Sequence, residues 1–183
     1  MTRTALATPL TLAFALGLPF AAQAETLTLY TSQPNADAQQ TVDAFMAANP
    51  GIDVDWVRDG TTQLMARLTA ETEAGAAQPD VLLIADTVTL EGMAQQGQLA
   101  AYTSPEAKAY DPALYSAEGY YYSTKLITSG IAYNTGVETP PASWSDLAAD
   151  DMANLTAMPS PLYSGAALIH LATLTSNPDL GWE

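Results

Sequence analysis

Polar side chains stand at three places where a predicted strand ends and a helix begins. These places are residues 31–33, 58–62 and 86–87, which supply hydroxyl, amide, guanidinium and carboxylate groups. In an open parallel sheet, ligands bind beyond the carboxyl ends of the strands, where the N–H groups and the dipole of a helix N-terminus favour an anion. The pattern therefore predicts a binding edge for an anion. Ordinary helix capping is the competing interpretation of each place.

The candidate ligand-binding residues at this edge combine neutral polar groups with one cation and one carboxylate, and they are Ser32, Gln33, Arg58, Thr61, Thr62 and Asp86. Ser164 and Gly165 offer a similar helix start farther along the chain. Arg58 is the candidate clamp for an anion, with a solvated turn residue as the alternative. Arg67 precedes Glu71 by four residues, which predicts a surface ion pair instead. The run of tyrosines at 120–122 suits a ligand stack or phenolate donors to ferric iron, although an amphipathic strand or loop edge is the simpler interpretation.

The sequence carries no motif for catalysis or for a resident metal. It has one histidine, His170, and no cysteine, which excludes zinc–thiolate, iron–sulfur and disulfide chemistry. A G-x-S-x-G elbow, an H-E-x-x-H pair, a P-loop and an EF-hand loop are all absent from it. We therefore expect no catalytic residue, no metal ligands and no cofactor. A secreted hydrolase that pairs His170 with a serine or aspartate is the competing class, although the apolar neighbours of His170 favour a packed side chain.

Alternating strands and helices are expected to position these side chains. Residues 26–30 and 52–56 alternate in polarity as strands do, and the continuous apolar run 81–85 predicts a strand buried on both faces. Residues at helical spacing follow each strand, with Asn35 and Asp86 as predicted N-caps. This order predicts an α/β fold with an open, mainly parallel sheet, right-handed crossovers and helices on both faces.

The second half of the chain is less regular. Residues 128–133 predict a strand, and residues 155–158 are a possible further strand. Ser143 is placed to cap a short helix, and a longer helix follows Ser164 with apolar residues from Ala167 to Leu174. A second α/β unit therefore begins here.

Charge and composition limit the partners. The 183 residues include 20 Asp and Glu against 5 Lys and Arg, giving a net charge of −15. Nucleic acids and anionic membranes require a cationic surface, so both are excluded as partners. A hydrophobic share of 48% is too high for a disordered chain. The chain is expected to fold around a core and to bind small molecules or proteins.

Residues 1–24 have the features of a secretory signal peptide. Arg3 precedes a short apolar stretch at 10–18, and the segment ends in Ala22-Gln23-Ala24, which predicts cleavage after Ala24. A membrane anchor is the alternative, but it needs about 20 apolar residues, and prolines interrupt the run. Because no cysteine follows the cleavage point, a lipid anchor is excluded. We expect a mature protein that is free in the periplasm, without stable membrane insertion.

Seven short motifs in order resemble a family of periplasmic solute-binding proteins. They are L-T-L-Y-T-S at 27–32, F-M-A-A-N-P-G-I at 45–52, P-D-V-L-L-I-A-D at 79–86, G-Q-L-A-A-Y at 97–102, G-I-A-Y-N-T at 130–135, P-x-S-W-x-D-L at 141–147 and S-G at 164–165. The family consists of receptors for ABC importers and includes binders of ferric iron and of phosphonates or sugar phosphates.

The resemblance implies a two-lobed, type II periplasmic-binding-protein fold that closes on its ligand at a hinge. Lobe 1 would span 25–129, and 130–183 would hold the first crossover strand and the start of lobe 2. Ser32, Gln33, Thr61, Thr62 and Asp86 would line the cleft from lobe 1, and Tyr163, Ser164 and Gly165 would face them from lobe 2. Members of the family are usually far longer, so the chain is expected to be an N-terminal portion that lacks the C-terminal half.

The same resemblance implies a non-enzymatic, monomeric receptor that delivers its solute to an ABC permease of the inner membrane. Many ferric members have a His or Arg where this chain has Gln33. We therefore expect a phosphonate or organophosphate as the ligand, with ferric iron as the alternative within the family. A truncated chain without activity is the third possibility.

Overall fold

The computed structural model describes residues 25–180, and its first part is a three-stranded parallel sheet. β1 (Glu25–Thr31) is the central strand, between β2 (Ile52–Arg58) and β3 (Val81–Leu83). β1 pairs with β2 along its whole length and with β3 near its carboxyl end. The two strands predicted from alternating polarity are confirmed. The predicted signal peptide lies outside the described residues.

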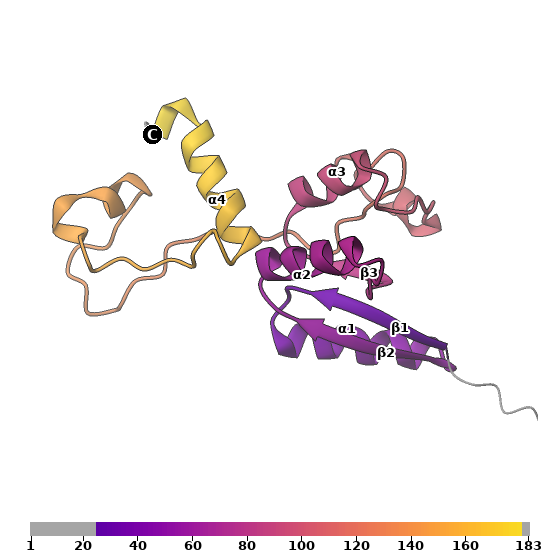
Figure 1. Ribbon diagram of the computed structural model, residues 1–183. Helices are drawn as coiled ribbons and strands as arrows, with labels where there is room; N and C mark the ends of the chain where they lie inside the picture. Colours follow the sequence, from indigo (N-terminus) through magenta and orange to yellow (C-terminus); the bar gives the residue numbers. More distant parts are fainter. Residues whose placement is uncertain (1–24, 181–183) are drawn as a thin grey trace, which may run out of the picture.

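Two helices cover opposite faces of this sheet, as Figure 1 shows. α1 (Asn35–Ala48) packs on β2 and buries Ala38 and Val42, and α2 (Thr61–Glu73) packs on β1 and buries Leu64. The chain moves outward from β1 to β2 and then back across β1 to β3, so crossovers of one hand put their helices on opposite faces. The predicted α/β class, with a parallel sheet and flanking helices, is confirmed.

α3 (Thr87–Gln95) follows β3, and it starts where the sequence predicted. Asp86 caps it by accepting hydrogen bonds from the backbone N–H of Val88 and Thr89. The turn after this helix ends at Gly97, whose φ of 69° lies in the left-handed region that favours glycine. We call residues 25–98 the sheet unit.

A buried tyrosine of β1, Tyr30, links the sheet to α2. The ring of Tyr30 is fully buried, and its hydroxyl donates to both carboxylate oxygens of Glu71, at 2.8 and 3.0 Å. Arg67 forms the predicted ion pair with Glu71 at 2.7 Å and lies over the Tyr30 ring, 4.9 Å from its centre. The hydrogen bond from Arg67 lowers the pKa of the Glu71 carboxyl, and burial raises the pKa of the Tyr30 hydroxyl.

Two local predictions in the sheet unit are wrong. The third strand ends at Leu83 instead of residue 85, and it is not buried on both faces, since Val81 is 48% exposed. It pairs only with β1 and lies at the edge of the described sheet, so no strand covers its outer side there. Asn35 is the first helical residue of α1, and Pro34, which has no side-chain donor or acceptor, occupies the N-cap position.

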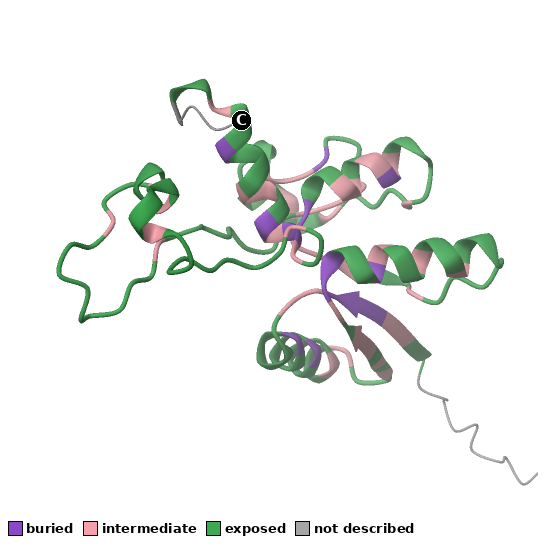
Figure 2. Ribbon diagram, turned by 60° about the vertical axis from the view of Figure 1, so that its left-hand side comes forward, coloured by how far each residue is buried: buried purple, intermediate pink, exposed green. Residues whose placement is uncertain are grey.

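The chain beyond residue 98 has little regular structure until its last long helix. Within residues 99–180 five short 3-10 helices occur, namely η1 (Pro105–Ala109), η2 (Pro112–Leu114), η3 (Ser145–Ala148), η4 (Asp150–Met152) and η5 (Pro178–Leu180). α4 (Gly165–Ser176) confirms the predicted helix after Ser164. Ser143 accepts from the backbone N–H of Asp146 at the start of η3, as its predicted capping role requires. Residues 134–160 run out from the sheet unit and are almost entirely exposed (Figure 2).

The strands predicted at 128–133 and 155–158 are absent from the structure. A strand needs a neighbouring strand for its backbone groups, and within the described part of the chain no backbone hydrogen bond involves residues 124–133. The predicted division into two lobes stays a prediction. Along residues 25–180, no helix combines the length and the apolar character that a bilayer span requires.

Candidate functional site

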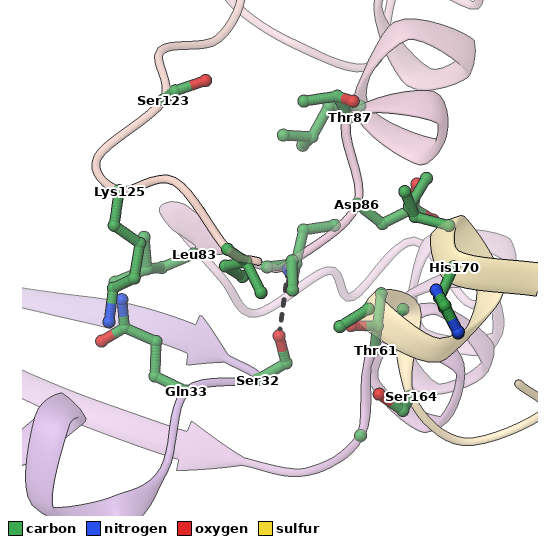
Figure 3. A pocket seen from close by; sticks show the side chains of 18 of the residues that line it. Ser32, Gln33, Thr61, Leu83, Asp86, Thr87, Ser123, Lys125, Ser164 and His170 are labelled. Atoms are coloured by element: carbon green, nitrogen blue, oxygen red, sulfur yellow. Dashed lines mark hydrogen bonds between the residues drawn. The ribbon is translucent and has the colours of Figure 1, made fainter. Parts of the chain in front are cut away.

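The first strand of the sheet ends in a short loop that ties β1 to β3. The backbone N–H of Ser32 donates to the Leu83 carbonyl at 3.1 Å, and the Ser32 hydroxyl accepts from the N–H of Ala85, also at 3.1 Å (Figure 3). Gln33 follows with its side-chain oxygen buried and without a hydrogen-bond partner among the described residues. Ser32 therefore shapes the edge, and Gln33 presents an unsatisfied amide there.

The second strand ends at Arg58, which reaches across the edge. Its Nε donates to the Gln33 carbonyl at 3.1 Å, and its Nη1 donates to the Tyr163 hydroxyl at 3.0 Å. Neither ion pair found among residues 25–180 includes Arg58, so no carboxylate there neutralises it. A guanidinium has five N–H donors, and these two bonds leave three of them free.

The N-termini of α2 and α3 lie side by side at this edge. Thr61 begins α2 and is only 3% exposed, and its hydroxyl oxygen has no hydrogen-bond partner among the described residues. Asp86 is equally buried, but its carboxylate is fully engaged by Val88 and Thr89. Asp86 therefore acts here as the cap that sequence reasoning weighed against a ligand role, while Thr61 has no cap function.

The N-terminus of α4 packs against these two helix starts at very short range. A Cβ built on Gly165 would lie 2.8 Å from the Thr61 hydroxyl oxygen and 3.1 Å from the Asp86 Cβ. A Cβ built on Gly60 would lie 2.5 Å from the Tyr163 carbonyl oxygen. Both positions therefore need glycine for this approach. We call residues 160–176 the docking segment.

A cleft of about 830 Å³ lies between the sheet edge and the docking segment. Eight of the nine predicted ligand-binding residues line it, and they are Ser32, Gln33, Arg58, Thr61, Asp86, Tyr163, Ser164 and Gly165. Thr62 is exposed and does not line the cleft, because the next position on the helix points elsewhere. The volume is within the range of ordinary small-molecule sites.

Sequence reasoning missed Lys125 as a residue of the cleft. Lys125 lines it near Gln33 (Figure 3) and forms a 3.1 Å ion pair with Asp37 of α1. Of the five Lys and Arg residues in the chain, Arg3 is outside the described part, so half of the remaining four line this one cleft. Lys125 belongs to an irregular segment, and no sequence pattern placed it at the sheet edge.

His170 and Trp144 form an aromatic wall on the side of α4. Their rings are 4.3 Å apart at 57°, and both residues are half-buried. His170 was predicted to be a packed core residue, but it lines the cleft. Within residues 25–180, no hydrogen bond joins His170 to a serine or an aspartate, and no group of three or more His, Asp or Glu side chains could hold a metal ion.

The tyrosines of the cleft have their hydroxyls engaged within the protein. Tyr121 donates to Glu91 at 2.8 Å, and this bond raises the pKa of Tyr121. Tyr122 donates to the Tyr102 carbonyl, and the Tyr163 hydroxyl accepts from Arg58. The tyrosine run thus stabilises a loop edge, which was the simpler of the two interpretations.

Comparison with known proteins identifies a family and shows a partial likeness to solved structures. Residues 30–178 match a family model described as bacterial extracellular solute-binding protein. The crystal structure of iron-bound HitA from Pseudomonas aeruginosa has 28% identity and a TM-score of 0.46, over 52% of this chain and 30% of that chain. A TM-score of this size does not establish a shared fold, so the likeness says nothing about the ligand here. No curated protein matches the chain.

Proposed function

Because the chain belongs to the bacterial extracellular solute-binding protein family, we propose that its cleft binds a small anionic solute for an ABC import system. In this role the protein captures the solute in the periplasm and delivers it to a permease of the inner membrane. The ligand-binding residues are those that line the cleft from the sheet edge and from the docking segment. The protein performs no chemistry on the solute.

The proposal of an anionic ligand rests on the guanidinium of Arg58, which is not paired with a carboxylate of residues 25–180. A chain with a net charge of −15 has an excess of carboxylates, yet none within the described residues pairs with Arg58. Its three free donors suit two oxygens of one oxyanion, because a guanidinium matches such groups in a bidentate manner. The dipoles of α2, α3 and α4, which begin beside the cleft, favour the same charge.

A phosphonate or organophosphate is the ligand class that suits these donors best. Lys125 adds a second cation to the lining, although its charge is partly offset by the ion pair with Asp37, so Arg58 is the main contact for a phosphoryl group. Ser164 and Gln33 supply neutral polar groups from the two sides of the cleft. Leu83 and Ile169 add an apolar wall for the organic part of the solute.

Ferric iron is the second candidate, favoured by Tyr121, Tyr122 and Tyr163 in the wall of the cleft. Phenolate and carboxylate oxygens are hard donors that suit a ferric ion. All three hydroxyls make hydrogen bonds within the protein, so iron binding would require at least two of these bonds to break. This requirement makes iron the weaker candidate.

Titration with three solutes separates these possibilities. We would follow the tryptophan fluorescence of the protein, in which Trp144 lines the cleft, with 2-aminoethylphosphonate, inorganic phosphate and ferric citrate. The proposal expects a saturable change with the phosphonate, and no visible charge-transfer band with iron. A charge-transfer band together with no response to either phosphorus compound would replace the proposed ligand by ferric iron. No response to any of the three would contradict the anionic-solute proposal.

A further inference from the structure

A second hollow, of about 320 Å³, adjoins the cleft, and three of its nine lining residues are tyrosines. Tyr110, Tyr115 and Tyr122 line it together with Glu106, and we call it the tyrosine hollow. It shares residues 122–124 with the cleft but none of the helix N-termini that favour an anion there. We propose that the tyrosine hollow binds an organic cation of the alkylammonium class.

Two of the three rings are held in place before any ligand binds. Tyr115 and Tyr122 pair as an antiparallel bridge, and their rings stack with centres 5.6 Å apart and planes 24° apart. The Tyr122 hydroxyl donates to the Tyr102 carbonyl and accepts from the N–H of Ser104 at 3.2 Å. A wall that is fixed in advance loses little conformational entropy on binding.

The third ring and the carboxylate come from η1 and the residue that follows it. Glu106 lies in η1, and Tyr110 follows that helix with its N–H bonded to the Ala107 carbonyl at 3.0 Å. Tyr110 is 63% exposed, although it has the large apolar surface of a tyrosine. Tyr110 therefore adds a solvent-accessible ring to the lining of the hollow.

The charge in the lining of the hollow is negative, which favours a cation over an anion as the ligand. The Glu106 carboxylate takes part in neither ion pair found among residues 25–180, and no lysine or arginine in that part of the chain lines the hollow. Lys108 lies in the same short helix but is not part of the lining. The net charge of −15 adds a long-range attraction for any cation.

The chemistry of these walls favours an alkylammonium ion over a metal ion or a sugar. Tyrosine faces attract a cation through the ring quadrupole, and an alkyl shell around the charge also packs on the rings. One carboxylate is too few for a hard metal ion, which takes six or more oxygen ligands. A neutral sugar also stacks on tyrosines and can donate hydroxyl groups to Glu106, but it gains no attraction from the negative charge of the chain.

A paired titration tests the cation against a neutral ligand of similar shape. Amide chemical shifts of the 15N-labelled protein would be followed with tetramethylammonium chloride and with neopentyl alcohol, at constant ionic strength. We expect saturable shifts at residues 104–124 with tetramethylammonium, and at least about tenfold weaker binding of the alcohol. Equal binding of both compounds, or no saturable shift with tetramethylammonium, would overturn the proposal.

Single substitutions test whether the cation binds in the tyrosine hollow. Tyr110→Ala and Glu106→Gln change exposed side chains, and each is expected to weaken tetramethylammonium binding about two- to fivefold. Tyr133→Ala and Glu138→Gln are matched controls, since both are exposed and neither lines the hollow; they should bind as the unmodified protein does. If the two hollow variants also bind unchanged, the cation binds elsewhere and the assignment is wrong.

Discussion

The sheet unit and the docking segment are held by different kinds of contact. The sheet unit is stabilised mainly by strand pairing and by a buried core, in which Tyr30, Thr31 and Leu64 are fully enclosed. Between the docking segment and the sheet unit the structure shows two close glycine contacts and one side-chain hydrogen bond, from Arg58 to Tyr163. Figure 2 shows the same contrast, with buried residues gathered in β1 and its helices and only a few in α4.

The docking contact also leaves a polar group unsatisfied. The Thr61 hydroxyl oxygen is buried beneath Gly165 without a hydrogen-bond partner among the described residues. Such a group costs about 1–3 kcal/mol. The contrast indicates that the docking segment should separate from the sheet unit at a lower free energy than the sheet unit needs to unfold, as the proposed capture of a solute in the cleft would require.

The largest expected effect is on the core of the sheet unit. Leu64→Ala removes a side chain that is 1% exposed and should lower the free energy of unfolding by about 2–5 kcal/mol. Urea denaturation followed by circular dichroism measures the change. Leu162→Ala is the control, because Leu162 is 78% exposed, and it should change the stability by less than about 0.5 kcal/mol. Equal losses in the two variants would show that α2 does not pack on the sheet as described.

A smaller and more local effect is expected at the docking contact. Gly60→Ala places a Cβ 2.5 Å from the Tyr163 carbonyl, so it should weaken docking by about 1–3 kcal/mol while the backbone at residue 60 (φ −63°) accepts alanine. Limited proteolysis within the exposed residues 134–160 should become faster, while hydrogen exchange in β1 stays the same.

Gly92→Ala is the matched control for this change. Gly92 lies within α3 and a Cβ there meets nothing within 4 Å, so the variant should be neutral or more stable by up to about 1 kcal/mol. If Gly60→Ala and Gly92→Ala are cleaved at the same rate, the close approach of Gly60 to Tyr163 does not hold the docking segment.

The smallest effect concerns acid stability and involves only the sheet unit. The folded pKa of Glu71 lies below its ordinary value of 4.5, because Arg67 and Tyr30 donate to its carboxylate. Its contribution to stability is therefore complete above that pH and decreases as the pH falls through the folded pKa.

Urea midpoints measured between pH 7 and pH 3 test this contribution. Glu71→Gln should be less stable than the unmodified protein at pH 7 and should lose less stability on acidification. Glu73→Gln is the control, since Glu73 is exposed and makes no side-chain hydrogen bond found among the described residues. A pH dependence that Glu71→Gln leaves unaltered would contradict the role of this carboxylate.

The same contrast explains which parts of the fold could be predicted. The alternation in β1 and β2 and the Asp86 cap of α3 depend on neighbours in the sequence, so local patterns were sufficient to place them. The strand expected at 128–133 depends on a partner strand from elsewhere, and composition alone cannot supply that partner. Val81 is exposed for a related reason, since its burial depends on what lies beyond the sheet edge.

In the candidate site, too, the residues placed by local patterns could be predicted, and those placed by distant contacts could not. The strand-end rule led to Ser32, Gln33, Arg58, Thr61 and Asp86, all of which line the cleft, because a parallel sheet brings strand ends together whatever the loops do. Tyr163 was reached only through the family resemblance. Lys125 was missed because its position depends on an irregular path and on an ion pair with Asp37, 88 residues away.

The most direct test of the central claim is the affinity of the cleft for methylphosphonate in the Arg58→Met variant. Isothermal titration should show a loss of about 10- to 150-fold, which corresponds to about 1.5–3 kcal/mol for hydrogen bonds to a charged group. Lys108→Met removes an equal charge outside the cleft and should bind as the unmodified protein does. An affinity that is unchanged in Arg58→Met, or lowered equally in both variants, would contradict Arg58 as the anion-binding cation.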